Sequence, residues 1–167
     1  MQTKDILKSV SEIIKHELSL ADDQIWLYNQ KKDIPKDTRV YFSIGLLSSK
    51  PYASKLEYVD MGAGELTEAI STNFQDVITI NIYSRSTLPI DDKNTVLSAL
   101  RGTYSQQKQM TTGYYIAVLP QTIMPITEED GTTILYRFNI PIVVQYMNVW
   151  IKDVEFFDKY KYNLITN

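Results

Sequence analysis

The side chains that most often carry acid–base or metal chemistry are sparse in this sequence. His16 is the single histidine, and it lies between Lys15 and Glu17 in a stretch with the periodicity of an ordinary amphipathic helix. With no second histidine and no HExxH motif, a zinc site has no recognisable ligand set. We therefore interpret His16 as a solvated surface residue and predict no metal site.

Paired carboxylates are the remaining groups that could catalyse a reaction. They occur as Asp-Asp at residues 22–23 and 91–92 and as Glu-Glu-Asp at residues 128–130. All three fall at predicted turns or helix starts, where helix capping and turn formation account for them. The third set also lacks the alternating ligand spacing of a calcium loop. Carboxylates alone could still serve an enzyme, but without any recognisable constellation.

Motifs for nucleophiles and cofactors are absent as well. The chain has no cysteine, which excludes disulfides, thiolate metal sites and cysteine nucleophiles. Its six glycines form no GxGxxG, no GxxxxGK[ST] and no GxSxG. We predict no cofactor and no catalytic residue, and we expect that the protein is not an enzyme.

The composition is that of a folded protein with modest charge. The 167 residues fit one domain, and 44% are hydrophobic and 22% charged. A net charge of −3 without a basic run argues against nucleic-acid affinity. The N-terminal stretch carries recurring charges instead of an apolar signal block, and no stretch reaches membrane-helix length, so we expect a soluble compartment and no membrane. Twelve tyrosines suit a Tyr-rich β core or extensive protein contacts.

Periodicity predicts the helices and most of the strands. Helices are expected over residues 4–20, with Thr3 as N-cap, and over 92–107, where Gly102 weakens the last turns. Alternation with a period of two predicts strands at 25–29, 39–47, 76–84 and 114–119, a short strand within 121–126 and a tight turn at 128–131. Residues 48–64, with Pro51, read as an excursion between strands with a short strand at 56–59, and residues 65–71 fit a helix or a strand.

The strongest pattern runs from Ile134 to Tyr146. Seven successive even positions there are apolar or aromatic, which predicts one strand of roughly 13 residues. That length exceeds the usual range, so part of the strand could project beyond its own sheet and pair with something else. Pro141 cannot donate a ladder hydrogen bond, and it is expected to mark a sheet edge or a bulge.

The order of the elements favours an α+β fold. Helices and strands do not alternate regularly, which predicts a mostly antiparallel sheet flanked by two amphipathic helices. Residues 1–150 are expected to form a single domain, and residues 151–167 a C-terminal arm or extension.

Four segments together resemble the neck and tail terminator proteins of contractile-tailed bacteriophages. They are FQDVITINIYSRS at residues 74–86, VLSALRGTYSQQ at 96–107, GYYIAVLP at 113–120 and EEDGTTILYRFNIPIVVQYMN at 128–148. The resemblance covers residues 25–150 and rests on the order of the elements and on the strings IYSRS, YIAVLP and LYRFNI.

The resemblance implies a structural virion protein with a tail-terminator-like fold. Such a chain would form a hexameric ring at the neck or top of the tail, end tube and sheath assembly, and join the tail to the head connector. Its partners would be copies of itself, the tail tube, sheath and head-connector proteins, and genomic DNA passing through the lumen without specific binding. It would be assembled in the host cytoplasm, with no cofactor and no reaction.

A ring requires that one patch of a subunit meets a different patch on its neighbour. Candidate interface residues lie in the 48–64 excursion, on the mixed face of the long strand and among the aromatic residues of the tail: Pro51, Tyr52, Arg137, Gln145, Phe156, Phe157 and Tyr160. The three groups also have plainer interpretations. The excursion would be a surface loop, the mixed strand face a solvated sheet face, and the tail a segment packed on its own domain.

Three other functions remain open at this point. The first is a head-completion or adaptor protein on the portal side, which would also form a ring. The second is a small carboxylate-dependent enzyme or ligand-binding domain. The third is a monomeric α+β domain with a scaffolding role. The oligomeric state and any bound small molecule would separate them.

Overall fold

The computed structural model describes residues 2–27, 35–60, 66–118, 120, 122–130 and 133–153 of the chain. Within these residues, three α-helices and one 3-10 helix accompany a seven-stranded, largely antiparallel sheet, which confirms the predicted α+β class. The helices are α1 (Thr3–Glu17), η1 (Asp22–Gln24), α2 (Pro89–Arg101) and α3 (Thr103–Thr112). The strands are β1 (Ile25–Leu27), β2 (Tyr41–Asp60), β3 (Leu66–Ser84), β4 (Tyr114–Val118), β5 (Met124–Pro125), β6 (Glu128–Asp130) and β7 (Thr133–Asp153).

Three long strands form the centre of the sheet. The strand order is β1-β2-β3-β7-β4, and β5 and β6 pair with β7 along the edge that β4 also occupies. Strand β1 runs parallel to β2, whereas the other pairs are antiparallel. The register between β3 and β7 is continuous from Thr67↔Asp153 to Ser84↔Tyr136, whereas β2 has register shifts at 46–48 and 51–53.

The helices cover one face of the sheet, here called the helix-side face. The even-numbered side chains of β3 and β7 lie on it, and those of Ile80 and Ile142 are fully buried there. Helix α1 presents Ile6, Val10 and Ile14 to the same core, as its spacing of three and four predicts. Burying each such side chain contributes about 1.5–3 kcal/mol, so this layer supplies the main stabilisation of the fold.

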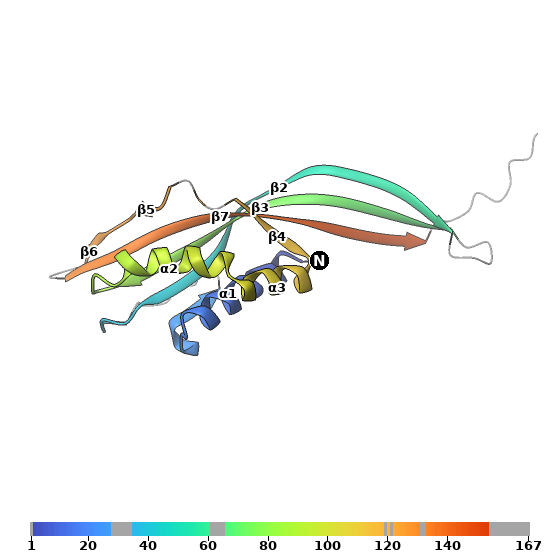
Figure 1. Cartoon of the computed structure of the whole chain (residues 1–167). Helices are drawn as coiled ribbons and strands as arrows, with labels where there is room; N and C mark the ends of the chain where they lie inside the picture. Colours follow the sequence, from blue (N-terminus) through green and yellow to red (C-terminus); the bar gives the residue numbers. More distant parts are fainter. Residues whose placement is uncertain are drawn as a thin grey trace, which may run out of the picture.

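The helices are too short to cover the whole sheet. A 21-residue strand such as β7 spans about 70 Å, whereas the 15-residue helix α1 spans about 22 Å. Figure 1 shows all three helices against one half of the long strands, while the other half of β2, β3 and β7 extends beyond them. We call the extension the arm (residues 53–60, 66–73 and 147–153) and the remainder the body.

The helical predictions need three corrections. Helix α1 begins at Thr3, so Gln2 occupies the N-cap position and the Thr3 hydroxyl bonds to β-strand residues instead. The second predicted helix is two helices, α2 and α3, because the chain is extended at Gly102 (φ −64°, ψ 164°). Two flanking helices were expected, and three α-helices pack on the sheet.

The strand predictions were too short. Residues 48–64 were interpreted as an excursion, but residues 48–60 continue β2 to Asp60, with Pro51 inside the strand, and residues 61–64 lie outside the described part of the chain. The ambiguous residues 66–71 are strand as well, at the start of β3. Residues 128–130 form β6 instead of a turn, and residues 131–132 lie outside the described part of the chain. The domain boundary placed at residue 150 falls within β7, which ends at Asp153.

The position of Pro141 agrees with its missing backbone donor. It faces Thr79 of β3 in regular register. On the other side of β7, strand β5 pairs with β7 residues up to Asn139, and strand β4 pairs with β7 residues from Val143 onward. Pro141 therefore falls between two short edge strands. The missing N–H group therefore lies at a gap in the edge, as proline in a sheet requires.

Ile142 and Ile151 lie on the same strand in opposite environments. Ile142 is fully buried, and Ile151 is 64% exposed on the arm. We expect Ile142→Ala to lower the free energy of unfolding by about 2–5 kcal/mol, because it leaves a cavity. The matched control Ile151→Ala should change it by less than about 0.5 kcal/mol in a single chain. Urea denaturation at low chain concentration measures the free energy of unfolding of both variants. Equal losses of this free energy in the two variants would contradict the division into body and arm.

Candidate assembly surface

The arm is a three-stranded sheet with no layer packed on it among the described residues. Rows of three residues cross it, for example Leu56↔Ile70↔Trp150 on the helix-side face. None of its described side chains is buried. An uncovered sheet of this size has no core of its own, so its strands depend on the ladder that they share with the body.

Both faces of the arm carry large apolar side chains. On the helix-side face, Leu56, Tyr58 and Trp150 are each at least half exposed. The opposite face, here called the open face, carries the odd-numbered side chains of β7, and Met147 and Ile151 are exposed there. Single exposed apolar residues are ordinary, but a contiguous group on both faces of one projection is typical of an interaction site.

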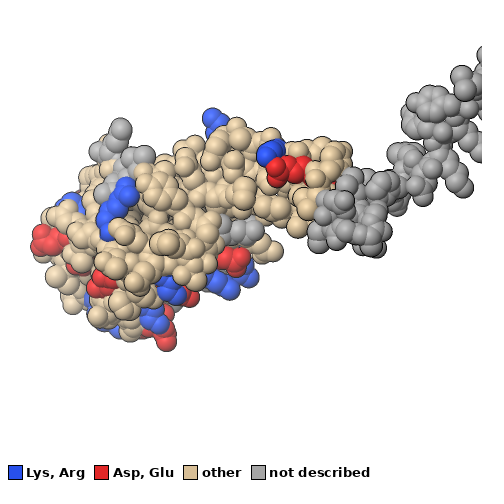
Figure 2. All heavy atoms as spheres, turned by 45° about the vertical axis from the view of Figure 1, so that its right-hand side comes forward, with Lys and Arg blue, Asp and Glu red and all other residues tan. Residues whose placement is uncertain are grey.

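Four of the charged groups on the arm form two ion pairs. Lys55 contacts Glu57, and the Lys152 Nζ atom lies 3.0 Å from a Glu68 carboxylate oxygen. In the view of Figure 2, most of the charged side chains lie over the body, and a few lie on the projecting arm. Because these ion pairs lie at the surface, they contribute little stability. The two lysines stand against four carboxylates, Glu57, Asp60, Glu68 and Asp153, so the arm is weakly acidic.

A buried carboxylate joins the base of the arm to the body. Asp76 accepts hydrogen bonds from the hydroxyl groups of Ser49 on β2 (2.5 Å) and Thr3 on α1 (3.1 Å). The Thr3 hydroxyl also lies 2.9 Å from that of Tyr146 on β7, and burial raises the pKa of Tyr146, which keeps this phenol protonated at neutral pH. The site is satisfied by its own neighbours, so we interpret it as a structural anchor.

Arg137 belongs to a polar network on the open face of the body. Its Nη2 atom lies 3.4 Å from the Asn81 Oδ1 atom, which also accepts a hydrogen bond of 2.9 Å from Asn139. Asn81 donates in turn to Ser43, and the Ser43 hydroxyl bonds to that of Tyr83 (2.9 Å). The Arg137 guanidinium also lies over the Tyr83 ring, 5.2 Å from its centroid. Arg137 is therefore engaged within its own chain.

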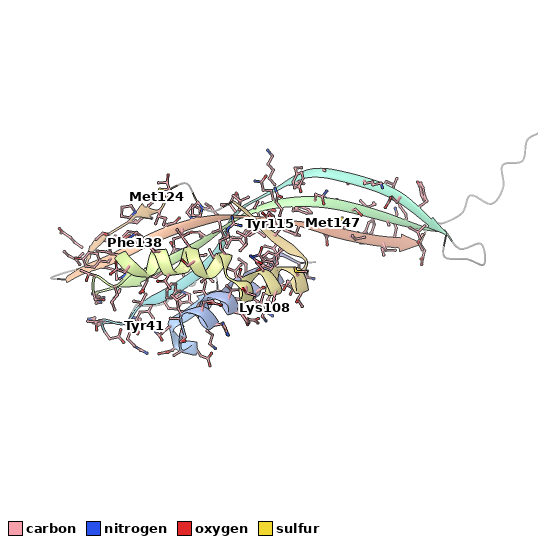
Figure 3. The ribbon with its side chains drawn as sticks, in the orientation of Figure 1. Tyr41, Lys108, Tyr115, Met124, Phe138 and Met147 are labelled. Carbon is pink, nitrogen blue, oxygen red and sulfur yellow. The ribbon has the colours of Figure 1, made fainter. Side chains whose placement is uncertain are left out.

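The other candidate interface residues are separated along the sheet. Pro51 and Tyr52 lie on β2 next to the arm, and Tyr52 is 52% exposed at a register shift. Gln145 is half-buried between Tyr115 of β4 and Gln75 of β3. Figure 3 shows Tyr115 beside the base of the arm and Met147 where the arm begins. Arg137 is about 26 Å away from Gln145 along β7. Phe156, Phe157 and Tyr160 lie outside the described residues.

The arm contains the exposed apolar residues that the sequence patterns did not single out. They are Leu56, Tyr58, Val59, Met147, Val149, Trp150 and Ile151. One signal was available, namely that the long strand was predicted to project beyond its sheet and pair with another partner. Its register with residues 66–73 was not foreseen, because those residues fit a helix as well as a strand.

Hollows elsewhere on the body offer little chemistry. One of about 360 Å³ lies between α2, α3 and β4, and its lining includes Arg101, Gln109 and Tyr114 but no carboxylate. Burial raises the pKa of Tyr114, whose hydroxyl bonds to that of Ser9 (3.1 Å), so it is a packed core residue. His16 stacks on Tyr104 at 3.9 Å on the exposed side of α1.

Two further properties concern the described residues as a set. They contain no group of three or more acidic, histidine or cysteine side chains placed to hold a metal ion. None of their helices combines the length and the apolar character that crossing a bilayer demands.

No protein-family model matches the chain, and no curated protein is significantly similar to it. The fold and its surface are therefore the observations that bear on function.

Asp76→Asn tests the anchor at the base of the arm. Hydrogen bonds to a charged group are worth about 1.5–3 kcal/mol, so we expect this variant to lower the free energy of unfolding by about 2 kcal/mol. Glu129→Gln, an exposed carboxylate on β6, is the matched control and should change it by less than about 0.5 kcal/mol. Urea denaturation followed by circular dichroism measures both. An unchanged Asp76→Asn midpoint would remove the anchor from this account.

Proposed function

We propose that this chain is a structural assembly protein whose arm binds other copies of the chain in a closed ring. The observation that carries the proposal is the uncovered arm, with half-exposed Trp150, Leu56 and Tyr58 on one face and Met147 and Ile151 on the other. Aromatic and large aliphatic side chains of this kind form the centres of protein interfaces. A partner that covers them would remove the cost of leaving them in water.

The size of the arm agrees with an interface. Three strands about 4.8 Å apart and eight residues long present about 400 Å² on each face. Covering both faces would bury about 800 Å² of each copy, which is what one partner contributes to a standard stable interface. The contact is heterologous, because a ring requires that one patch of each copy meets a different patch on its neighbour. Contacts of this kind close into rings or extend into filaments.

We place this ring at the neck or top of the tail of a contractile-tailed phage. This placement rests on the sequence resemblance given above. The ring would end tube and sheath assembly and join the tail to the head connector, with DNA passing through its lumen. No step of this role needs a cofactor or a catalytic residue, and the hydrogen-bond partners of Asp76 and Arg137 are consistent with structural functions for both.

The mass of the purified chain in solution tests self-assembly. We expect light scattering to give a species near six times 19.3 kDa, and negative-stain images to show a central hole. Trp150→Ser should shift the mass toward a single chain, because it removes the largest exposed apolar side chain of the arm. Met110→Ser on α3 is the matched control, since Met110 is 83% exposed but lies outside the arm, and it should keep the mass.

Association with tail tubes tests the position in the virion. Purified tubes should co-sediment with the wild-type protein and stop growing in its presence. Binding to a portal ring but not to tubes would favour the adaptor role instead. A chain that remains single at every concentration and binds neither structure would overturn the proposed function.

A further inference from the structure

The arm has two edges, and neither has a neighbouring strand among the described residues. Strand β1 pairs with β2 only at residues 42–44, and β4 reaches β7 only at residues 143–146. Residues 54–60 of β2 and 147–153 of β7 are therefore edge strands of similar length. Unpaired edge strands are templates for adding a strand from another chain.

Backbone geometry identifies the residues whose hydrogen-bonding groups point outward from β7. The Arg137 carbonyl oxygen accepts a hydrogen bond from the Ile126 N–H group (2.8 Å), on the side away from β3. Backbone groups of an antiparallel strand alternate between its two sides. Because the β3–β7 register has no shift up to Asp153, every odd residue of β7 points outward. In the arm these residues are Met147, Val149, Ile151 and Asp153.

The same alternation identifies the outward residues of β2. The backbone N–H and C=O groups of even-numbered β3 residues point toward β7. The β2 residues opposite them therefore point their own backbone groups away from the sheet. In the arm these are Ser54, Leu56, Tyr58 and Asp60. Pro51 lies opposite Phe74 and therefore belongs to the outward set too. The proline ring removes one outward N–H group next to the arm, whereas residues 54–60 keep all of their outward N–H groups.

The two edges are complementary in direction and side chains. Strands β2 and β7 both run from the body toward the arm tip, because each is antiparallel to β3. Copies related by rotation about an axis along the arms would bring β7 of one beside β2 of the next in parallel. Since Leu56 and Trp150 share a row, pairing at equal height would place Trp150 beside Leu56 of the next copy. Both side chains are at least half exposed in the single chain.

We propose that residues 147–153 of one copy pair in parallel with residues 54–60 of a second copy, so that the arms form one continuous sheet. The pairing rests on the proposed function, because it requires self-assembly. An edge about 23 Å long and 10 Å thick buries only about 230 Å² per copy, far below the roughly 800 Å² of a stable two-body interface. A closed ring uses both edges of every arm, which favours β7–β2 pairing over an isolated pair of β7 edges.

Proline substitutions at outward positions test the pairing without breaking the β3 ladder. Val149→Pro and Leu56→Pro each remove one outward N–H group, as Pro141 and Pro51 already do elsewhere in the same two strands. We expect both variants to keep the circular dichroism spectrum of the wild type and to lose the ring in light scattering. Val149→Thr is the matched control: it keeps the N–H group and should keep the ring.

Each outcome has one meaning. Loss of the ring in both proline variants but not in Val149→Thr supports the pairing. Rings that survive both proline substitutions, or that are also lost in Val149→Thr, overturn it in favour of contacts through the faces of the arm. Loss in Val149→Pro alone overturns it in favour of two β7 edges. A wild-type chain that never assembles overturns the proposed function itself, before the pairing is reached.

Discussion

The shared ladder of β2, β3 and β7 is the constraint on which the rest of the structure depends. These strands continue in register far beyond the end of the helices, so one sheet is packed at one end and uncovered at the other. In the body, Ile80 and Ile142 are fully buried under the helices, and this packing stabilises the ladder. In the arm, the same ladder holds Trp150 and Ile151 in water. Stability and exposed apolar surface are thus produced by the same three strands.

Sequence patterns predicted the body well because the two faces of its sheet lie in different environments. The helix-side residues Ile78, Ile80 and Ile82 alternate with Thr79 and Asn81, and this contrast gives a clear period of two. The amphipathic stripe of α1 was equally clear, since it has one packed face. The split between α2 and α3 was missed because Gly102 only weakens a helix by intrinsic propensity, whereas here it adopts an extended conformation.

The arm was not predicted, for a physical reason. Neither of its faces is buried by the described residues, and polar and apolar residues occur on both, so no period appears. Pro51, Gly62 and Gly64 made residues 48–64 resemble an excursion between strands. Of the candidate interface residues, Pro51 and Tyr52 lie next to the arm, whereas Arg137 is tied into the network around Asn81. The strand length that predicted a projection was the one sequence signal that pointed to the surface now proposed.

Hydrogen–deuterium exchange of the arm, in assembled and in diluted chains, tests most directly whether copies meet there. Outward-pointing amides of residues 54–60 and 147–153, which have no strand beside them among the described residues, should exchange fast in single chains and slow down at concentrations where rings form. Amides of the buried segment 140–144 should be protected equally in both states. Arm amides that exchange equally fast in the assembled protein would contradict the claim that the arm is the contact between copies.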